Sequence, residues 1–73
     1  MDEEERICGA HFVKLEDGRQ LEQAVVVIMN GRVVNYYEFR DEIAMCEWMG
    51  GTIEVKRDEE DYLRAYWHGK ILE

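Results

Sequence analysis

The 73-residue chain contains no serine, no proline and a single threonine, Thr52. Serine and threonine supply the hydroxyl nucleophile of many hydrolytic enzymes, so a hydrolytic triad can scarcely be assembled from this sequence. Only two cysteines are present, Cys8 and Cys46, too few for the disulfide framework of a small secreted domain. Burial on an apolar face keeps a thiol protonated and unreactive, so packing is the favoured role for Cys46.

Basic residues are fewer than acidic ones: the chain has nine lysines and arginines and seventeen aspartates and glutamates, which gives a formal net charge of −8. Eight of the acids lie in two runs, residues 2–5 and 58–61, and the other nine balance the basic residues. Phosphate binding needs concentrated lysine and arginine, so we expect no nucleic-acid binding. An acidic inhibitor that mimics nucleic acid is an alternative, although such a mimic would spread its charge over a face.

Long apolar runs are also missing, and none approaches the roughly 20 residues that a membrane helix needs. The N-terminal residues are acidic where a signal peptide would be basic and then apolar, so we expect a cytoplasmic protein that does not enter a membrane. Residues 1–5 are predicted to form a disordered acidic arm, since like charges repel. Hydrophobic residues make up 47% of the chain and predict a single folded domain over residues 6–73.

The clearest structural signal is the pair Asn30-Gly31, which separates two apolar runs. Both residue types adopt the positive φ of a primed two-residue turn, so the pair predicts a β-hairpin. Its first strand is expected over residues 21–29, where residues 24–29 are apolar on both sides, as in a central strand covered on two faces. Its second strand is expected over residues 32–37.

A further strand is predicted before this hairpin, over residues 6–15, with a turn at residues 16–19. Gly9 within it indicates a bulge or a close approach of another segment. Strict alternation would divide its side chains between two faces: Ile7, Gly9, His11, Val13 and Leu15 on one, and Cys8, Ala10, Phe12 and Lys14 on the other. Short connections then predict a three-stranded antiparallel meander.

A single short helix is predicted over about residues 39–49, because Phe39, Ile43 and Cys46 recur at helical spacing and Gly50-Gly51 would end it.

Two or three further strands are expected after the helix. Two segments alternate in side-chain direction on either side of the acidic loop 58–61: residues 52–56, and residues 62–67, where Leu63, Ala65 and Trp67 alternate with Tyr62, Arg64 and Tyr66. His68-Gly69 could turn the chain into a last strand over residues 70–72. The predicted fold class is α+β, mainly β.

Metal binding is the next function to weigh, and the sequence gives it little support. Cys8 and His11 have a Cys-x-x-His spacing, but on a strand they would point to opposite faces. With Cys46 and His68 the chain has four possible metal ligands, but this is only a count. The loop 58–61 lacks the alternation and glycine of a calcium loop. We therefore predict no metal, no cofactor, no catalytic residue and no small-molecule substrate.

Aromatic and methionine side chains exceed what a sheet and one short helix can bury. Trp, Tyr and Met are enriched at the centres of protein interfaces, which favours a docking surface for a protein partner or for a second copy of the chain. The alternative is that a small domain simply exposes some aromatic residues. The predicted surface comprises Met45, Trp48, Tyr62 and Tyr66.

Several segments together resemble the opening of metal-dependent amidohydrolases: Arg6-Ile7-Cys8-Gly9-Ala10-His11-Phe12-Val13, Asp17-Gly18, Leu21 through Val26-Val27-Ile28, Asn30-Gly31-Arg32-Val33-Val34, Gly51-Thr52-Ile53-Glu54-Val55 and Gly69-Lys70-Ile71-Leu72. In that superfamily an N-terminal meander forms part of a small β-sandwich beside the catalytic barrel.

The resemblance covers most of residues 6–72 and implies a free-standing form of this noncatalytic composite domain. No His-x-His pair follows Leu72 and no barrel is present, so no catalytic or metal residue is carried over. The resemblance also suggests an accessory subunit of a separately encoded amidohydrolase-like enzyme.

Overall fold

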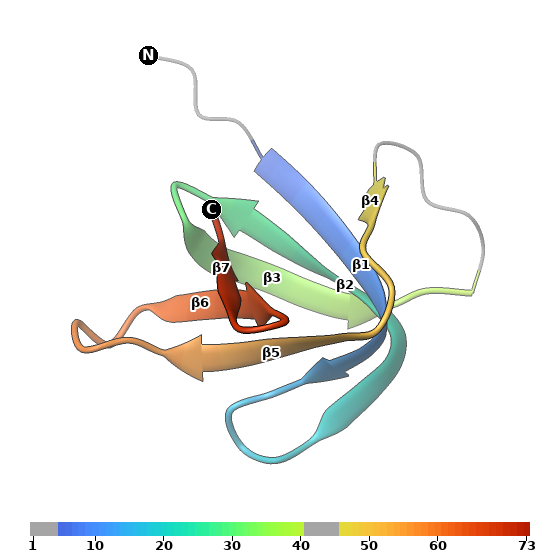
Figure 1. Ribbon diagram of the computed structural model, residues 1–73, viewed down its shortest axis with the longest axis horizontal. Helices are drawn as coiled ribbons and strands as arrows, with labels where there is room; N and C mark the ends of the chain where they lie inside the picture. The colour runs from blue at the N-terminus through green and yellow to red at the C-terminus, as the bar shows by residue number, and fades with distance from the viewer. Residues whose placement is uncertain (1–4, 41–45) are drawn as a thin grey trace.

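The computed structural model describes residues 5–40 and 46–73, which form one mixed β-sheet (Figure 1). Its strands are β1 (Glu5–Lys14), β2 (Gln20–Met29), β3 (Arg32–Glu38), β4 (Cys46–Trp48), β5 (Thr52–Arg57), β6 (Leu63–Trp67) and β7 (Lys70–Leu72). The mainly β prediction is confirmed for these residues. Residues 1–4 of the predicted arm lie outside the described part, while Glu5 already belongs to β1.

The first three strands form the predicted antiparallel meander, with β2 between β1 and β3. Asn30 and Gly31 have φ values of 54° and 75°, as a primed two-residue turn requires. Ala24 to Ile28 are all buried, so both faces of β2 are covered there and the expected central strand is confirmed.

The expected alternation along β1 holds for only half of the strand. Cys8 and Ala10 belong to the hydrophobic core, but the core then continues with Val13 and Leu15, which is a step of three residues instead of two. Phe12, which alternation would place beside Ala10, is 38% exposed. The predicted division into two faces is therefore wrong beyond Ala10.

An interruption of the β1–β2 ladder at His11 and Gln23 accounts for this shift. Residues on either side keep their antiparallel pairing, but these two are skipped, and Gln23 has a φ of 49°. Such local irregularities bend a strand and re-aim its side chains. The same bend shifts the inward residues of β2, where Leu21 and Ala24 both pack on the core side.

The predicted helix over residues 39–49 is not seen among the described residues. Residues 41–45 lie outside them, and Cys46–Trp48 form strand β4, parallel to β1. Phe39 donates a backbone hydrogen bond to the Gln23 carbonyl at 2.9 Å, as a continuation of the β2–β3 pairing would. Short apolar runs fit a helix or a strand equally well, and here the edge of β1 offers backbone partners that the sequence does not reveal.

Both β4 and β5 run parallel to β1 along the same edge. The first half of β1 pairs with β4 and the second half pairs with β5. Gly50 and Gly51 separate the two strands, with φ values of 73° and 61°. These glycines were predicted to end a helix, and they instead form a bend between two strands.

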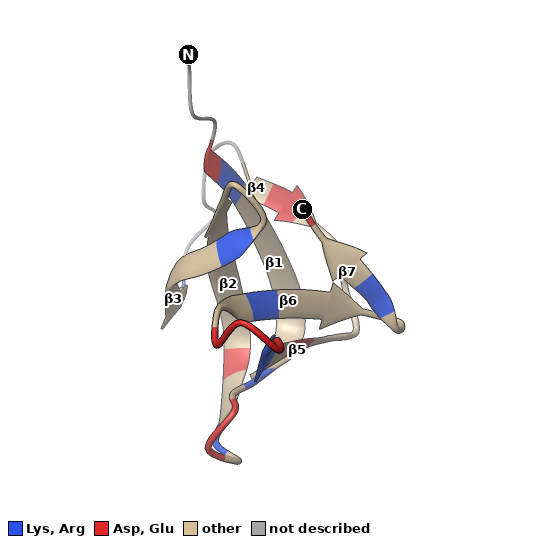
Figure 2. Cartoon of the chain, turned by 90° about the vertical axis from the view of Figure 1, so that its left-hand side faces the viewer, with Lys and Arg blue, Asp and Glu red and all other residues tan. Residues whose placement is uncertain are grey.

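The remaining strands form an antiparallel β5–β6–β7 unit. Its second turn is the predicted pair His68-Gly69, with φ values of 51° and 79°. The sheet order β3-β2-β1-β5-β6-β7 curls on itself, so β6 comes to lie against β3 (Figures 1 and 2). The core fills the space inside this curl, and its members include Val26, Ile53 and Ala65.

Candidate functional site

The most exposed large aromatic side chain belongs to Trp48 at the end of β4, with 49% of it exposed. Its ring meets the His11 ring edge-on at 5.0 Å between centroids and the Phe39 ring edge-on at 6.1 Å. Edge-on contacts of this kind are favourable aromatic geometries. We call these three side chains the Trp48 surface.

Gly9 lies beneath this surface and explains how β4 can approach β1 so closely. A Cβ atom at Gly9 would lie 2.9 Å from Cys46 Sγ and 3.0 Å from Trp48 Cε3. Both distances are shorter than ordinary contacts between carbon or sulfur atoms. The close approach predicted from Gly9 is therefore observed, and it places Trp48 directly over the β1 backbone.

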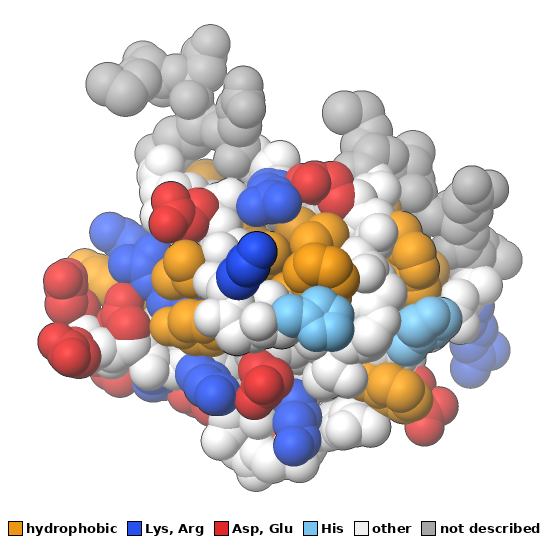
Figure 3. Space-filling view, in the orientation of Figure 1, with side chains coloured by type: hydrophobic (Ala, Val, Ile, Leu, Met, Phe, Trp, Pro, Cys, Tyr) orange, Lys and Arg blue, Asp and Glu red, His pale blue; other side chains and the backbone are white. Residues whose placement is uncertain are grey.

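The bend after β4 is fixed by a second indole. Trp67 Nε1 donates a hydrogen bond to the Gly50 carbonyl at 2.9 Å, and the Trp67 ring lies 4.2 Å from the His68 ring. Both histidine side chains are visible on the face drawn in Figure 3, each beside hydrophobic side chains. The Gly50 carbonyl, two residues after Trp48, is thus bonded to Trp67, which limits the freedom of the end of β4.

The three described residues of the predicted surface, Trp48, Tyr62 and Tyr66, each contact different side chains. Met45 lies outside the described residues. Tyr62 stacks under the Arg32 guanidinium at 3.9 Å, and Tyr66 lies 5.9 Å from the Lys56 ammonium. The ring neighbours of Trp48 are His11 on β1 and Phe39, the residue that follows β3.

Sequence reasoning missed these two neighbours for identifiable reasons. The helical spacing placed Phe39 in a helix with Ile43 and Cys46, and strict alternation placed His11 on a face that the bend interrupts. Some of the aromatic and methionine side chains that the sequence suggested would be exposed pack against the core instead: Tyr36, Met49 and Trp67.

The cysteines and histidines considered as metal ligands do not converge. Cys8 is fully buried in the core, and burial raises the pKa of its thiol to about 11. Cys46 lies over Gly9 on the other face of the sheet, and its thiol pKa is also raised by burial. His11 contacts Trp48 and His68 contacts Trp67. The described ranges contain no group of three or more metal-ligating side chains.

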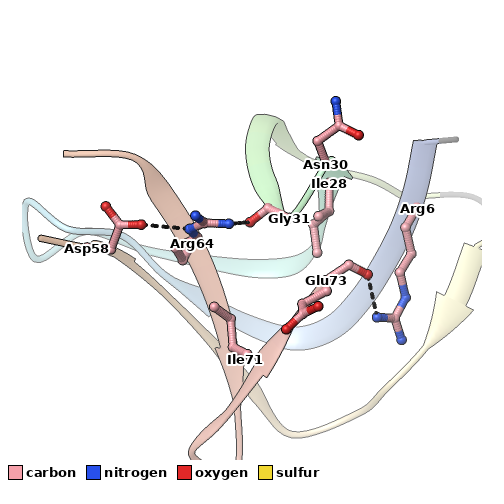
Figure 4. A pocket seen from close by; sticks show the side chains of 8 residues that line it. All are labelled: Arg6, Ile28, Asn30, Gly31, Asp58, Arg64, Ile71 and Glu73. Atoms are coloured by element: carbon pink, nitrogen blue, oxygen red, sulfur yellow. Dashed lines mark hydrogen bonds and ion pairs between the residues drawn. The ribbon is translucent and has the colours of Figure 1, made fainter. Parts of the chain in front are cut away.

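A cavity of about 540 Å³ opens between the β2–β3 turn and β7, and we call it the mouth cavity (Figure 4). Its apolar wall comes from Ile28 and Ile71, and its cations are Arg6 and Arg64.

Both guanidinium groups of the mouth cavity are already paired with carboxylates of the chain. Arg6 forms a two-pronged ion pair with Glu47 at 2.7 and 3.2 Å, and the hydrogen bond from Arg6 lowers the pKa of Glu47. Arg64 pairs with Asp58 at 2.8 Å. An anionic ligand would therefore compete with these carboxylates for either arginine.

The acidic turn at residues 58–61 has exposed side chains at positions 59–61 and is organised by hydrogen bonds to Asp58. Asp58 accepts hydrogen bonds from Arg64 Nε and from the backbone N–H groups of Glu60 and Tyr62, at 2.8 to 3.0 Å. The Arg64 bond, followed by the Tyr62 N–H, holds the Asp58 pKa below its usual value. Asp58 thus acts as the anchor of the turn.

Comparisons with protein-family models, with curated proteins and with solved structures found no match to this chain. The resemblance to amidohydrolases therefore stays a prediction. Within the described segments, no helix has the length and apolar character needed to cross a bilayer.

Proposed function

We propose that this chain is a noncatalytic protein-interaction domain, which binds a partner protein or a second copy of itself through the Trp48 surface. The observation that carries the proposal is that Trp48 is half exposed and yet held edge-on by two other rings. A side chain that is already oriented loses little conformational freedom when a partner covers it.

Tryptophan is the residue type most suited to such a role, because it combines a large apolar area with two rotatable bonds. Alanine substitution of interface tryptophans commonly costs 2 kcal/mol or more of binding free energy, on the order of a thirtyfold loss of affinity. The other exposed large hydrophobic side chains of the described segments are two aromatics that are less exposed than Trp48, Phe12 and Tyr37, and two smaller aliphatic side chains, Val34 and Ile71.

The state of the thiols also supports a noncatalytic role. A thiolate is the reactive form of cysteine, and burial raises the pKa of both Cys8 and Cys46. Packing is the better account of both residues.

The test compares Trp48→Ala with Val34→Ala, which removes an apolar side chain that is 55% exposed at another place on the sheet. Sedimentation equilibrium measures self-association, and affinity capture with the tagged chain, quantified for each variant, measures partner binding. We expect Trp48→Ala to weaken the association by about thirtyfold or more and Val34→Ala to leave it unchanged. Tyr66→Ala shows whether the binding surface extends to β6.

Circular dichroism checks that each variant keeps its strands. A folded Trp48→Ala variant that associates as strongly as wild type would refute the proposal, as would a wild-type chain that stays monomeric and captures no partner.

A further inference from the structure

β3, at one end of the curled sheet, meets β6, the strand next to the other end, at a seam between the two. These strands lie in contact, yet within the described residues β3 pairs only with β2, and β6 pairs with β5 and β7. A backbone ladder therefore does not close the seam, and side chains must do so.

Arg64 on β6 makes the central contact across this seam. Its Nη1 donates to the Gly31 carbonyl in the β2–β3 turn at 2.7 Å, and its Nε donates to Asp58 Oδ2 at 2.8 Å (Figure 4). A guanidinium group can serve two acceptors at once because its donors point in fixed, separate directions. The arginine is only 22% exposed, so solvent screens these bonds less than it would on an open surface.

Asp58 lies on the same side of the seam as Arg64, in the turn between β5 and β6. Its other carboxylate oxygen accepts the N–H groups of Glu60 at 2.9 Å and Tyr62 at 3.0 Å, so Asp58 is fixed in the turn and holds the Arg64 guanidinium in the position from which Nη1 reaches the Gly31 carbonyl. A second contact crosses the same seam, since the Arg32 guanidinium lies 3.9 Å from the centroid of the Tyr62 ring. The acidic turn, drawn in red at the start of β6 in Figure 2, is thus joined to the β2–β3 turn through Arg64.

We propose that Arg64, Asp58 and the Gly31 carbonyl form a releasable clamp that holds β6 against the β2–β3 turn and keeps the core beneath the mouth cavity covered. When the clamp is released, β3 separates from β6 while the β1–β2–β3 and β5–β6–β7 units keep their own ladders. The parallel β1–β5 pairing on the opposite side is the hinge of this motion. Local opening of this kind has a lower free energy than global unfolding, because most of the buried contacts survive it.

Ile28 is the side chain that reports the opening. It lines the mouth cavity and is only 1% exposed, so separation of β3 from β6 brings solvent to its methyl groups. Ile53 is fully buried on β5, next to the hinge, and stays covered in the open form. The two isoleucines therefore distinguish opening of the seam from general loosening of the core.

The test measures methyl NMR relaxation caused by a soluble gadolinium chelate in wild type, Asp58→Asn and Glu59→Gln. Both substitutions remove one negative charge from the same turn, but Glu59 is not the anchor of Arg64. Without the Asp58 carboxylate the Arg64 guanidinium is no longer held toward the Gly31 carbonyl, so its bond across the seam is weakened. Loss of one hydrogen bond from a charged donor raises the open population roughly tenfold, so we expect Asp58→Asn to increase the relaxation of Ile28 and not that of Ile53. Glu59→Gln should match wild type.

Arg64→Lys provides a second route to the same result. It keeps the positive charge but cannot reach Asp58 and the Gly31 carbonyl together, so it should also expose Ile28 selectively. Equal relaxation of Ile28 and Ile53 in both clamp variants would overturn the proposal, and so would an Asp58→Asn protein that behaves like Glu59→Gln. If Asp58→Asn does not fold, Arg64→Lys alone decides between these outcomes.

Discussion

At the scale of single residues, Gly9 is the position where the absence of a side chain matters most. It lets Cys46 and Trp48 lie over β1, and its partner across the ladder, Val25, is fully buried. The position of Trp48 and its close contact with β1 therefore both depend on the absence of a side chain at Gly9.

We predict that Gly9→Ala destabilises the protein by about 1–3 kcal/mol, the usual cost of forcing extra volume into a packed contact. Urea unfolding measures the change. Cys46→Ala removes the nearer obstacle at 2.9 Å, so the double variant should lose less stability than the sum of the single losses. Strict additivity would mean that Cys46 does not oppose the new methyl group.

At the scale of elements, turns and strands differ in how much their sequence determines them. Asn30-Gly31 and His68-Gly69 adopt positive φ values, which their local sequence suffices to predict. β4 differs, because its residues have no strand signal of their own and pair with β1 only through a long-range parallel contact. The bend at Gln23 likewise has no signal in the alternation, so Phe39 and His11 could not be assigned to the Trp48 surface from the sequence.

Asp58, in the turn between β5 and β6, should make the stability of the fold depend on pH. Its folded pKa is lowered, so its carboxylate stabilises the fold above the unfolded pKa of about 3.9, and this contribution is lost as the pH falls through the folded pKa. Asp58→Asn should therefore be less stable than wild type at pH 7, and the difference should shrink below about pH 4.

Urea unfolding of both proteins between pH 2 and pH 7 tests this, with pH values chosen around the carboxylate range. Glu59→Gln is the matched control, because it removes one negative charge from the same turn while Asp58 still accepts the Arg64 hydrogen bond. A stability difference between Asp58→Asn and wild type that stays constant down to the lowest pH would contradict the role of the ionised Asp58.

At the scale of the whole molecule, one core joins both units of the sheet. Cys8 and Val26 from the meander pack in the same cluster as Val55, Ala65 and Leu72 from the β5–β6–β7 unit. The sequence predicted most of these strands, because their apolar runs are bounded by turn residues. It could not predict the curl that brings them together, because the seam depends on Arg64 reaching a backbone carbonyl 33 positions away in the sequence.

A shared core predicts that the domain unfolds in one cooperative transition. Trp48 stands beside β1, and Trp67 lies on β6 against the core, so the two indoles report on different parts of the sheet. The variants Trp67→Phe and Trp48→Phe leave one indole each, and in each variant the urea midpoint from fluorescence should equal the midpoint from circular dichroism. Comparison within a variant removes any effect of the substitution on overall stability.

Opening of the Arg64 clamp does not alter this expectation, because it exposes Ile28 without breaking the ladders of the β1–β2–β3 and β5–β6–β7 units. Fluorescence of Trp48 that changes before the circular dichroism signal would instead show that β4 detaches as a separate unit, and the Trp48 surface would then lack the fixed geometry on which the proposed binding depends.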